Sequence, residues 1–203
     1  MPRLLLASNN PGKAAEYRRL LAGAPYRLVT PPEIGLELCV AESGKSFEEN
    51  AILKATSYAA ASGLLTIADD SGLEVDALGG EPGVLSARYA GEKAGDTERN
   101  AFLLSRLKRI PMERRQARFR CVIALASPKG LIGTVSSEVE GLIALEPGGR
   151  HGFGYDPIFY LPELSNTMAE LPPEEKNNIS HRARAAAKLK MLLNNLRPDN
   201  NTT

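Results

Sequence analysis

The alternation of hydrophobic and polar positions along the chain predicts strands and helices in mixed order. Residues 4–7 form a short apolar run that is typical of a buried strand, and a helical pattern follows it. Asn10 can cap this helix, and Pro11 suits its first position. Residues 64–68 form the next apolar run. We therefore expect a second strand that ends just before the two aspartates of IADDSG.

Three further helices are marked by the polar residues at their starts. Ser46 and Glu49 have the spacing of a capping box, which predicts a helix that runs to about residue 61. Asp96 is expected to cap a helix that continues through Leu107, and Ser180 is expected to cap a final alanine-rich helix.

Two long apolar patterns predict a β-hairpin. Residues 119–126 and 131–145 favour strands, and residues 127–130 have the composition of the connecting turn. Strands and helices are thus interleaved, and one strand pair is antiparallel. We expect an α/β or α+β protein, and assign it to the α/β class with a mixed β-sheet and flanking helices.

Composition narrows the range of partners. With 203 residues, of which 43% are hydrophobic and 24% charged, the chain is long enough to form one domain with a substantial core. Its 25 basic and 24 acidic side chains give a formal net charge of +1. Because neither sign dominates, nothing marks the whole surface for nucleic acid or an anionic membrane. Any anionic ligand must be bound by a local group of residues.

Cysteine usage and the length of the apolar runs predict a soluble cytoplasmic protein. Cys39 and Cys121 stand far apart and outside any C-x-x-C motif, so we expect two buried thiols and no zinc site or disulfide framework. No run approaches the roughly 20 apolar residues of a membrane span, and MPRLLLASNN is too soon interrupted for a signal peptide. We expect residues 1–196 to form one domain and residues 197–203 a polar tail.

The segment SNNPGK places Gly12 and Lys13 between a strand and the first turn of a helix. Free backbone N–H groups and the helix dipole favour an anion such as phosphate there. The segment is not a Walker A loop, because Ala7 stands at its first glycine position and Ala14 replaces the hydroxyl residue that binds magnesium. A metal at this phosphate site would need ligands from elsewhere. A capped helix with an exposed lysine explains the motif equally well.

The acidic candidates for such a metal are Glu42, Asp69 and Asp70. Magnesium takes one or two carboxylates plus phosphate oxygens, so a Glu and an Asp far apart in sequence would suffice. Successive side chains of a strand point to opposite faces, so Asp69 and Asp70 cannot both enter one site unless the strand has ended. At most one of them is expected to carry the chemistry. Each carboxylate can instead be a turn or cap residue.

Basic and aromatic residues could complete an anion or base site. Lys54 borders the apolar face of its helix, where it can either snorkel or face a polyphosphate groove. Glycines on both sides of Phe153 in GGRHGFGYDP would let the ring approach a flat ligand, or they form a tight connection after the hairpin. His181 and Arg182 fall in the first turn of the last helix, where cations oppose the dipole, which hints at recognition.

Taken in this order, the segments resemble the inosine triphosphate pyrophosphatase family, also described as dITP/XTP pyrophosphatases. The resemblance runs from residue 4 to about residue 193. It rests on SNNPGK, SFEENAILKA, ADDSGLEVDALGGEPGVLSARYAG, ARFRCVIAL, HGFGYDPIF and EEKNNISHR. ADDSGL and FGYDP together with SHR are its specific parts. Pro11 in the phosphate segment and His151 before GFGYDP depart from the usual pattern only in detail.

The resemblance implies a magnesium-dependent hydrolase that cleaves non-standard purine nucleotides (ITP, dITP, XTP) to the monophosphate and pyrophosphate. Such an enzyme would cleanse the nucleotide pool and prevent incorporation of these nucleotides into DNA and RNA. The resemblance also implies a homodimer whose two-lobed subunit holds the substrate in a central cleft. It gives Asp70 the catalytic role and assigns Glu42 and Asp70 to Mg²⁺. The matching substrate-binding residues are Ser8, Asn9, Asn10, Pro11, Gly12, Lys13, Lys54, Ser71, Phe153, Gly154, Tyr155, Asp156, Lys176, His181 and Arg182.

Two questions stay open at this stage: whether Asp70 accepts a proton, and how the site selects its nucleobase. An aspartate has an unperturbed pKa of about 3.9 and is a weak base unless Asp69 or partial burial raises that pKa, whereas a metal lowers it. Hypoxanthine and xanthine carry a 6-oxo acceptor where adenine carries an amino donor. Donors on His181 or Arg182 that adenine leaves unpaired would discriminate by roughly 10⁴-fold. Exclusion of guanine must depend on its 2-amino group, for which the sequence offers no candidate.

Two other functions compete with this one. The first is a nucleotide-sensing protein that binds its ligand without turnover. The second is a nucleic-acid binder, suggested by the basic residues Lys108, Arg109, Arg114, Arg115, Arg118 and Arg120. Because no aromatic platform accompanies them, this group is expected to be a solvated edge, and neither nucleic acid nor membrane is expected as a partner.

Overall fold

The structure, a computed structural model, describes residues 1–196, apart from the side chain of Asn177. The helices are α1 (Pro11–Leu20), α2 (Phe47–Ser62), α3 (Asp96–Arg106), α4 (Pro173–Ile179) and α5 (His181–Asn195). The strands are β1 (Arg3–Leu6), β2 (Arg27–Val29), β3 (Leu65–Val75), β4 (Gln116–Ser127), β5 (Gly130–Ile143), β6 (Phe159–Leu161) and β7 (Asn166–Thr167). The polar tail expected for residues 197–203 lies outside the described residues.

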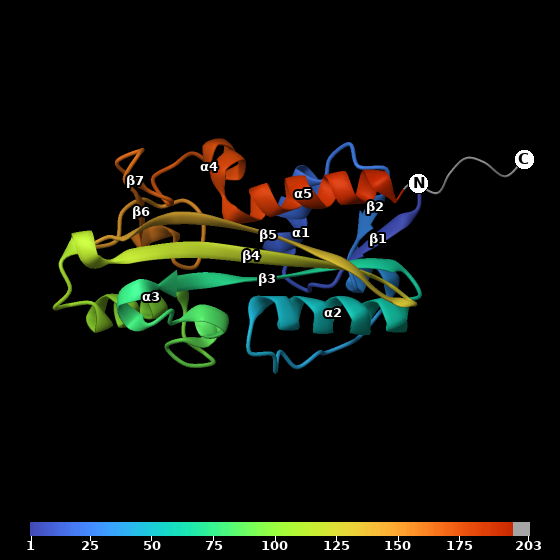
Figure 1. Ribbon diagram of the computed structural model, residues 1–203, viewed down its shortest axis with the longest axis horizontal. Helices are drawn as coiled ribbons and strands as arrows, with labels where there is room; N and C mark the ends of the chain where they lie inside the picture. The colour runs from blue at the N-terminus through green and yellow to red at the C-terminus, as the bar shows by residue number, and fades with distance from the viewer. Residues whose placement is uncertain (197–203) are drawn as a thin grey trace, which may run out of the picture. The chain divides into compact units, whose positions relative to one another are not determined.

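The strands form one mixed sheet in the order β2-β1-β3-β4-β5-β6-β7 (Figure 1). β1 pairs in parallel with β2 and β3, whereas β6 pairs antiparallel with β5 and β7. Parallel neighbours need a crossover connection, and α1 and α2 supply it between β1, β2 and β3. The expected α/β class with a mixed sheet and flanking helices is confirmed.

The chain divides into two compact units. Of the described residues, the first contains 1–70, 122–136 and 183–196, and the second contains 71–121 and 137–182. β3, β4, β5 and α5 pass from one unit to the other. The boundary on β3 falls between Asp70 and Ser71, in the middle of the motif that the sequence singles out.

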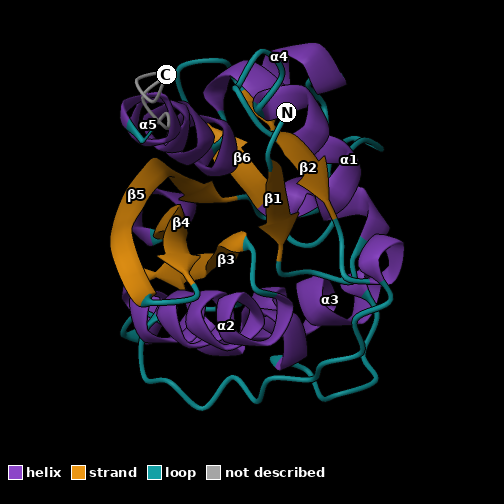
Figure 2. Cartoon of the chain, turned by 90° about the vertical axis from the view of Figure 1, so that its right-hand side faces the viewer, coloured by secondary structure: helices purple, strands orange, loops and turns teal. Residues whose placement is uncertain are grey.

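In the first unit, helices cover both faces of the sheet. Figure 2 shows α2 against one face and α1 with α5 against the other. The central residues of β1 and β3 are accordingly apolar and buried: Leu5, Leu6, Ile67 and Ala68 are fully buried. Ala51, Ala55 and Ala59 of α2 and Ala186, Leu189 and Leu193 of α5 are fully buried as well.

The second unit has its own apolar core, which lies beside the loop that carries Phe153. Its fully buried members include Leu73, Leu103, Leu107, Ile143, Ile158 and Phe159. The phenyl rings of Phe119 and Phe159 pack with centroids 4.5 Å apart. Tyr155 belongs to the same core, so the loop between β5 and β6 is anchored by apolar burial.

Most of the predicted helix starts are confirmed. The Asn10 side chain accepts a hydrogen bond from the Lys13 amide at 3.1 Å, and Pro11 is the first residue of α1. Ser46 Oγ accepts from the Glu49 amide at 3.1 Å, although the Glu49 carboxylate returns to the Lys45 amide instead of that of Ser46. Both caps are local hydrogen bonds, so the sequence is sufficient to predict them.

Two predictions about element ends are wrong. β3 does not stop before the aspartates but continues through Asp69 and Asp70 to Val75, because pairing with neighbouring strands keeps the segment extended. Asp96 is the first helical residue of α3, and Gly95 is its N-cap. The Gly95 amide donates to Glu98 Oε2 at 2.9 Å, so Glu98 takes part in this cap and the Asp96 carboxylate is used elsewhere.

The short elements were not predicted. β2, β6, β7 and α4 contain two to seven residues each, too few for a clear periodicity. The prediction of two buried thiols is half right: neither cysteine forms a disulfide, but Cys39 is exposed and only Cys121 is buried. None of the helices within residues 1–196 is long and apolar enough to span a membrane.

Candidate functional site

Asp69 and Asp70 lie where β3 extends beyond its neighbour β1. The register pairs Leu6, the last residue of β1, with Ile67 of β3. The next residues of β3 therefore lie beside the segment that leaves β1 for α1. The two aspartates are 2% and 9% exposed. Carboxyl ends of parallel strands are where α/β proteins gather ligand-binding side chains, so this position favours a site.

Asp69 forms an ion pair with a lysine of α1, the helix that follows β1. Lys13 Nζ, in the first turn of α1, lies 3.0 Å from both carboxylate oxygens of Asp69. The preceding segment folds on itself, since the Asn10 amide donates to Ser8 Oγ at 3.2 Å. Gly12 belongs to the first turn of the helix, where a Cβ would lie 3.1 Å from Asn10 Oδ1. The segment that sequence reasoning assigned to phosphate is thus a strand-to-helix turn with a paired lysine.

Asp70 faces the other helix, α2. Lys54 Nζ donates to Glu42 Oε1 at 2.7 Å and to the Asp69 carbonyl at 2.8 Å, and lies 3.7 Å from Asp70 Oδ1. Lys54 is only 9% exposed, so it does not snorkel to the surface. Alternation along β3 therefore sends the two aspartates to different lysines, as the strand rule requires.

Asn50 supports this cluster and was missed by sequence reasoning. It lies one helical turn before Lys54 on α2 and is 1% exposed. Its Oδ1 accepts from the Gly44 amide at 2.8 Å, and its side chain hydrogen-bonds Asp70. An asparagine four residues from a lysine on an otherwise apolar helix face is the signal that could have identified it.

Burial controls the ionisation of the cluster. Burial raises the pKa of Asp70 above its usual range, against the opposing charge of Lys54, and the nearby Glu42 carboxylate adds to the rise. Burial alone would lower the pKa of Lys54, but Asp70, Asp69 and Glu42 together raise it above its usual value. The lysine therefore stays charged.

The acidic residues fit a cation between Glu42 and Asp70. Within residues 1–196, no three Asp, Glu, His or Cys side chains form a metal-binding group. Glu42 and Asp70 nevertheless both approach one ammonium group, that of Lys54, so two carboxylates already share a cation. Two protein carboxylates supplemented by phosphate oxygens and waters are a typical ligand set for Mg²⁺.

The second unit presents an exposed aromatic ring between cations. Phe153 is 50% exposed, and Lys176 Nζ and Arg182 Cζ lie 4.9 and 5.7 Å from its ring centroid. Asp156 forms an ion pair with Lys176 and accepts from the Phe153 amide at 2.8 Å. Gly152 has φ +79°, and a Cβ there would lie 2.1 Å from Asp156 Oδ2, so only glycine fits.

The two cationic residues at the start of α5 have partners in the second unit. The His181 ring stacks on Phe119 with centroids 4.9 Å apart and planes 12° apart. Arg182 Nη2 donates to Ser71 Oγ at 3.0 Å. His181 and Arg182 are 8% and 4% exposed. Both side chains are thus packed against neighbouring groups and largely shielded from solvent.

The predicted site residues therefore fall into two groups, one in each unit. Ser8, Asn9, Asn10, Pro11, Gly12, Lys13, Glu42, Lys54 and Asp70 belong to the first unit. Ser71, Phe153, Gly154, Tyr155, Asp156, Lys176, His181 and Arg182 belong to the second. The groups adjoin in the chain at the peptide bond between Asp70 and Ser71.

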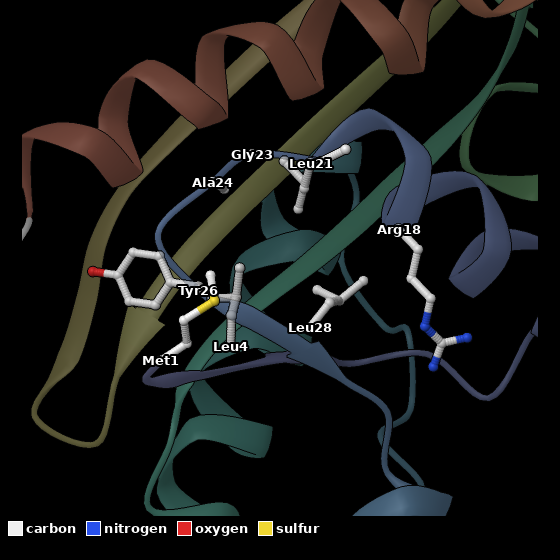
Figure 3. A pocket seen from close by; sticks show the side chains of 9 residues that line it. Met1, Leu4, Arg18, Leu21, Gly23, Ala24, Tyr26 and Leu28 are labelled. Atoms are coloured by element: carbon white, nitrogen blue, oxygen red, sulfur yellow. The ribbon is translucent and has the colours of Figure 1, made fainter.

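A separate hollow of about 250 Å³ lies in the first unit at the far end of α1 (Figure 3). Its walls include Leu4, Leu21 and Leu28, and Arg18 is the one charged side chain among its nine described lining residues. Arg18 pairs with Glu33 at 2.9 Å. Because Lys13 is in the first turn of α1 and Leu21 follows its last, this apolar hollow is distinct from the carboxylate cluster.

Comparison with known proteins gives consistent results. The profile of the Ham1 family matches residues 4–192. A protein from Desulforamulus reducens named dITP/XTP pyrophosphatase is 52% identical over 194 residues, covering 96% of each chain. A Bacillus subtilis protein of the same name is 50% identical over 193 residues, covering 95% of this chain and 98% of its own. A solved structure of a HAM1 protein from Coxiella burnetii superposes with a TM-score of 0.89 at 43% identity, covering 96% of this chain and all of the other.

Proposed function

Because the chain belongs to the Ham1 family, we propose that it is a nucleoside triphosphate pyrophosphatase acting on non-standard purine nucleotides. It hydrolyses dITP, XTP and ITP to the monophosphate and pyrophosphate, which cleanses the nucleotide pool before these bases enter DNA and RNA. Relatives about 50% identical over nearly the whole chain carry the name dITP/XTP pyrophosphatase. The observation that carries the proposal is the Lys54 ammonium held between Glu42 and Asp70.

The residues that we propose to bind the triphosphate belong to the first unit. The turn from Ser8 to Lys13 leads into the N-terminus of α1, where backbone N–H groups and the dipole favour phosphate. Lys13 and Lys54 add two positive charges. They face three carboxylates, those of Glu42, Asp69 and Asp70, so the cluster alone has an excess of negative charge. A polyphosphate anion would be repelled unless a divalent cation came with it, which is the physical reason to propose metal dependence.

Glu42 and Asp70 would hold this metal, which we propose to be Mg²⁺. When bound, the ion would neutralise charge on the phosphate oxygens. Asn50 hydrogen-bonds the Asp70 side chain and holds it in place. Lys54 donates to Glu42, and when the substrate binds it would donate to a phosphate oxygen instead. Lys13 likewise can exchange Asp69 for phosphate, because its side chain is 21% exposed and that of Asp69 only 1%.

Asp70 is proposed to orient the attacking water and accept its proton. The water oxygen forms a bond to the α-phosphorus while the bond from this phosphorus to the bridging oxygen breaks, and pyrophosphate leaves. The raised pKa of Asp70 makes the carboxylate a better proton acceptor than an exposed aspartate. Asp69 is committed to Lys13 and therefore has a supporting role.

The residues that we propose to bind the base belong to the second unit. Phe153 offers an exposed ring face for stacking, and Lys176, His181 and Arg182 provide donors for a 6-oxo group. A 6-amino group would leave such donors unpaired, and sites of this kind discriminate by roughly 10⁴-fold. Ser71 fixes the Arg182 guanidinium, and Asp156 fixes the Lys176 ammonium.

A nucleotide panel assayed for both possible products tests the proposal. Purified protein with Mg²⁺ should convert ITP, dITP and XTP to monophosphate and pyrophosphate, with ATP and GTP far slower. Release of inorganic phosphate, or tight binding without turnover, would contradict the proposal, and the second result would identify a nucleotide sensor. Assays with Mg²⁺, Mn²⁺ and Ca²⁺ after chelator treatment determine the metal.

The nucleic-acid alternative finds no support in the basic residues that suggested it. Arg115 is 4% exposed and donates to three backbone carbonyls, those of Leu107, Ile110 and Ala144. Arg118 pairs with Asp76 at 2.7 Å, and Arg120 lies 3.9 Å from Glu74. Three of the six basic residues are thus buried or close to a carboxylate, which argues against one continuous cationic surface.

Assembly and location complete the proposal. We expect the homodimer that the family resemblance implies, which sedimentation equilibrium measures directly. We also expect the enzyme to act in the cytoplasm, because its proposed substrates are nucleotides of the intracellular pool.

A further inference from the structure

We propose that Asp96 and Asn100, on α3, are positioning residues that fix the Phe153 ring for the nucleobase. This inference rests on the proposed function, since it assigns Phe153 to the base. The carboxylate of Asp96 does not cap its own helix. Asp96 Oδ2 instead accepts a hydrogen bond from the Gly154 amide at 2.6 Å.

Asn100 binds the other backbone polar group of Gly154, its carbonyl. Its Nδ2 donates to the Gly154 carbonyl at 3.1 Å. Asp96 and Asn100 are four residues apart on α3 and so share one helix face. Together they pair with both backbone polar groups of Gly154, the residue directly after Phe153. One rigid helix turn thus sets the path of the loop at this point.

Phe153 needs such support because core packing does not hold it. The ring is 50% exposed, and the Lys176 and Arg182 side chains lie beside it. With half of the ring in solvent, its orientation depends on the backbone on either side. On one side the Phe153 amide donates to Asp156, and on the other Gly154 is held by α3. A stacking platform that is fixed before binding loses less entropy when the base arrives.

The Asp96 carboxylate is itself held in position. It forms an ion pair with Arg99, whose Nη1 donates to the carbonyls of Ala87 and Ala94 at 2.9 and 2.6 Å. Arg99 ties the first turn of α3 to the loop that precedes it. The contact to Gly154 is therefore made by an oriented, charged acceptor, which gives a stronger hydrogen bond than a neutral one.

Only part of the buried Asn100 amide is hydrogen-bonded, which points to the same role. It is 4% exposed, and within the described part of the chain no group donates to its Oδ1. An unmatched buried amide oxygen destabilises the fold. An apolar residue of similar size would avoid that cost but would lose the contact with Gly154. The amide at this position is thus better explained by the loop that it holds than by the stability of α3.

The test combines a structural readout with base-dependent binding. In the wild type, the Gly154 amide should exchange slowly with solvent in an NMR hydrogen-exchange experiment. Asp96→Ala should speed this exchange at least 10-fold and weaken binding of IMP, which carries the base, by roughly 10- to 100-fold in calorimetry. Binding of pyrophosphate, which has no base, should stay within about twofold. In turnover assays the loss should lie mainly in KM for ITP.

Three further variants separate positioning from simple stability. Asp96→Asn keeps an oxygen that can accept from Gly154 and should recover most of the IMP affinity. Asn100→Leu removes the unmatched oxygen, so it should leave Tm nearly unchanged while weakening IMP binding. Glu98→Gln is the matched control, since Glu98 lies in the same turn and caps Gly95 without contacting Gly154. It should lower Tm slightly and leave the Gly154 exchange and the IMP affinity unchanged.

The outcomes are distinguishable. Unchanged Gly154 exchange in Asp96→Ala, or faster exchange with unchanged IMP affinity, would overturn the inference. Equal weakening of IMP and pyrophosphate would show a general structural defect and overturn it too, as would failure of the wild type to bind IMP. IMP binding without hydrolysis of ITP would count against the proposed function alone, because the exchange and binding measurements need no turnover.

Discussion

Lys13 Nζ lies 3.0 Å from both carboxylate oxygens of Asp69, whereas the next residue, Asp70, faces Lys54 from the other side of the strand. Two adjacent aspartates thus form ion pairs with lysines of two different helices, α1 and α2. The reason is the alternation of side chains along β3, which does not end before them. This division predicts different consequences for the two carboxylates.

Asp70→Asn should reduce turnover of ITP at least 10³-fold, because it removes the proposed proton acceptor and a metal ligand together. Asp69→Asn should cost about 10-fold, since it releases Lys13 but leaves the Asp70 cluster intact. Steady-state kinetics measure both, and circular dichroism checks that the fold is preserved. Equal and mild losses in the two variants would show that the reacting carboxylate is a different one.

Asp70→Asn should also stabilise the metal-free protein at neutral pH. Burial raises the pKa of Asp70, so the ionised group costs folding free energy when it is charged. Stability linked to a raised carboxyl pKa is fully present below the unfolded value of about 3.9 and is lost as pH rises through the folded value. The variant should therefore have the higher Tm at pH 7, and this advantage should disappear toward pH 4.

Calorimetry in the presence of a chelator measures this difference. For a chain of this size each 1 kcal/mol shifts Tm by about 2–4 °C, so a gain of a few degrees is the expected scale. A difference in Tm that is the same at pH 7 and pH 4 would contradict the linkage, and so would a lower Tm of the variant at pH 7.

Lys54→Met should expose the need for a cation between Glu42 and Asp70. Removing the ammonium leaves two carboxylates without their shared partner, which should destabilise the metal-free protein by about 1–3 kcal/mol. Because the methionine cannot compete for the carboxylates, millimolar Mg²⁺ should raise the Tm of this variant more than that of the wild type. Lys45→Met, an exposed lysine just before α2, is the matched control and should respond like the wild type.

Gly152→Ala and Gly154→Ala should separate a steric clash from backbone strain. Both glycines have positive φ, +79° and +65°, which costs a non-glycine residue about 1–2 kcal/mol. A Cβ at Gly152 would also lie 2.1 Å from Asp156 Oδ2, whereas at Gly154 no atom lies within 4 Å of it. Gly152→Ala should therefore lose clearly more stability in urea unfolding, and more ITP affinity. Equal losses would show that the Asp156 contact does not constrain this turn.

Local chemistry made part of this structure predictable. The Asn10 and Ser46 caps, the β4–β5 hairpin and the mixed sheet follow from residue preferences and periodicity over short distances. The alternation rule also correctly predicts that Asp69 and Asp70, when extended, point to different sides of the strand. That expectation holds for any extended segment, whichever strands pair with it.

The partners of each charged side chain could be decided only by the tertiary structure. Three contacts depend on which segments pack together. Lys13 pairs with Asp69, and Lys54 lies between Glu42 and Asp70. Asp96 accepts a hydrogen bond from Gly154 instead of capping α3. The same holds for the burial that raises the pKa of Asp70. A sequence specifies which groups can form hydrogen bonds and ion pairs. Long-range packing decides which of them meet, because distances and desolvation exist only in the folded chain.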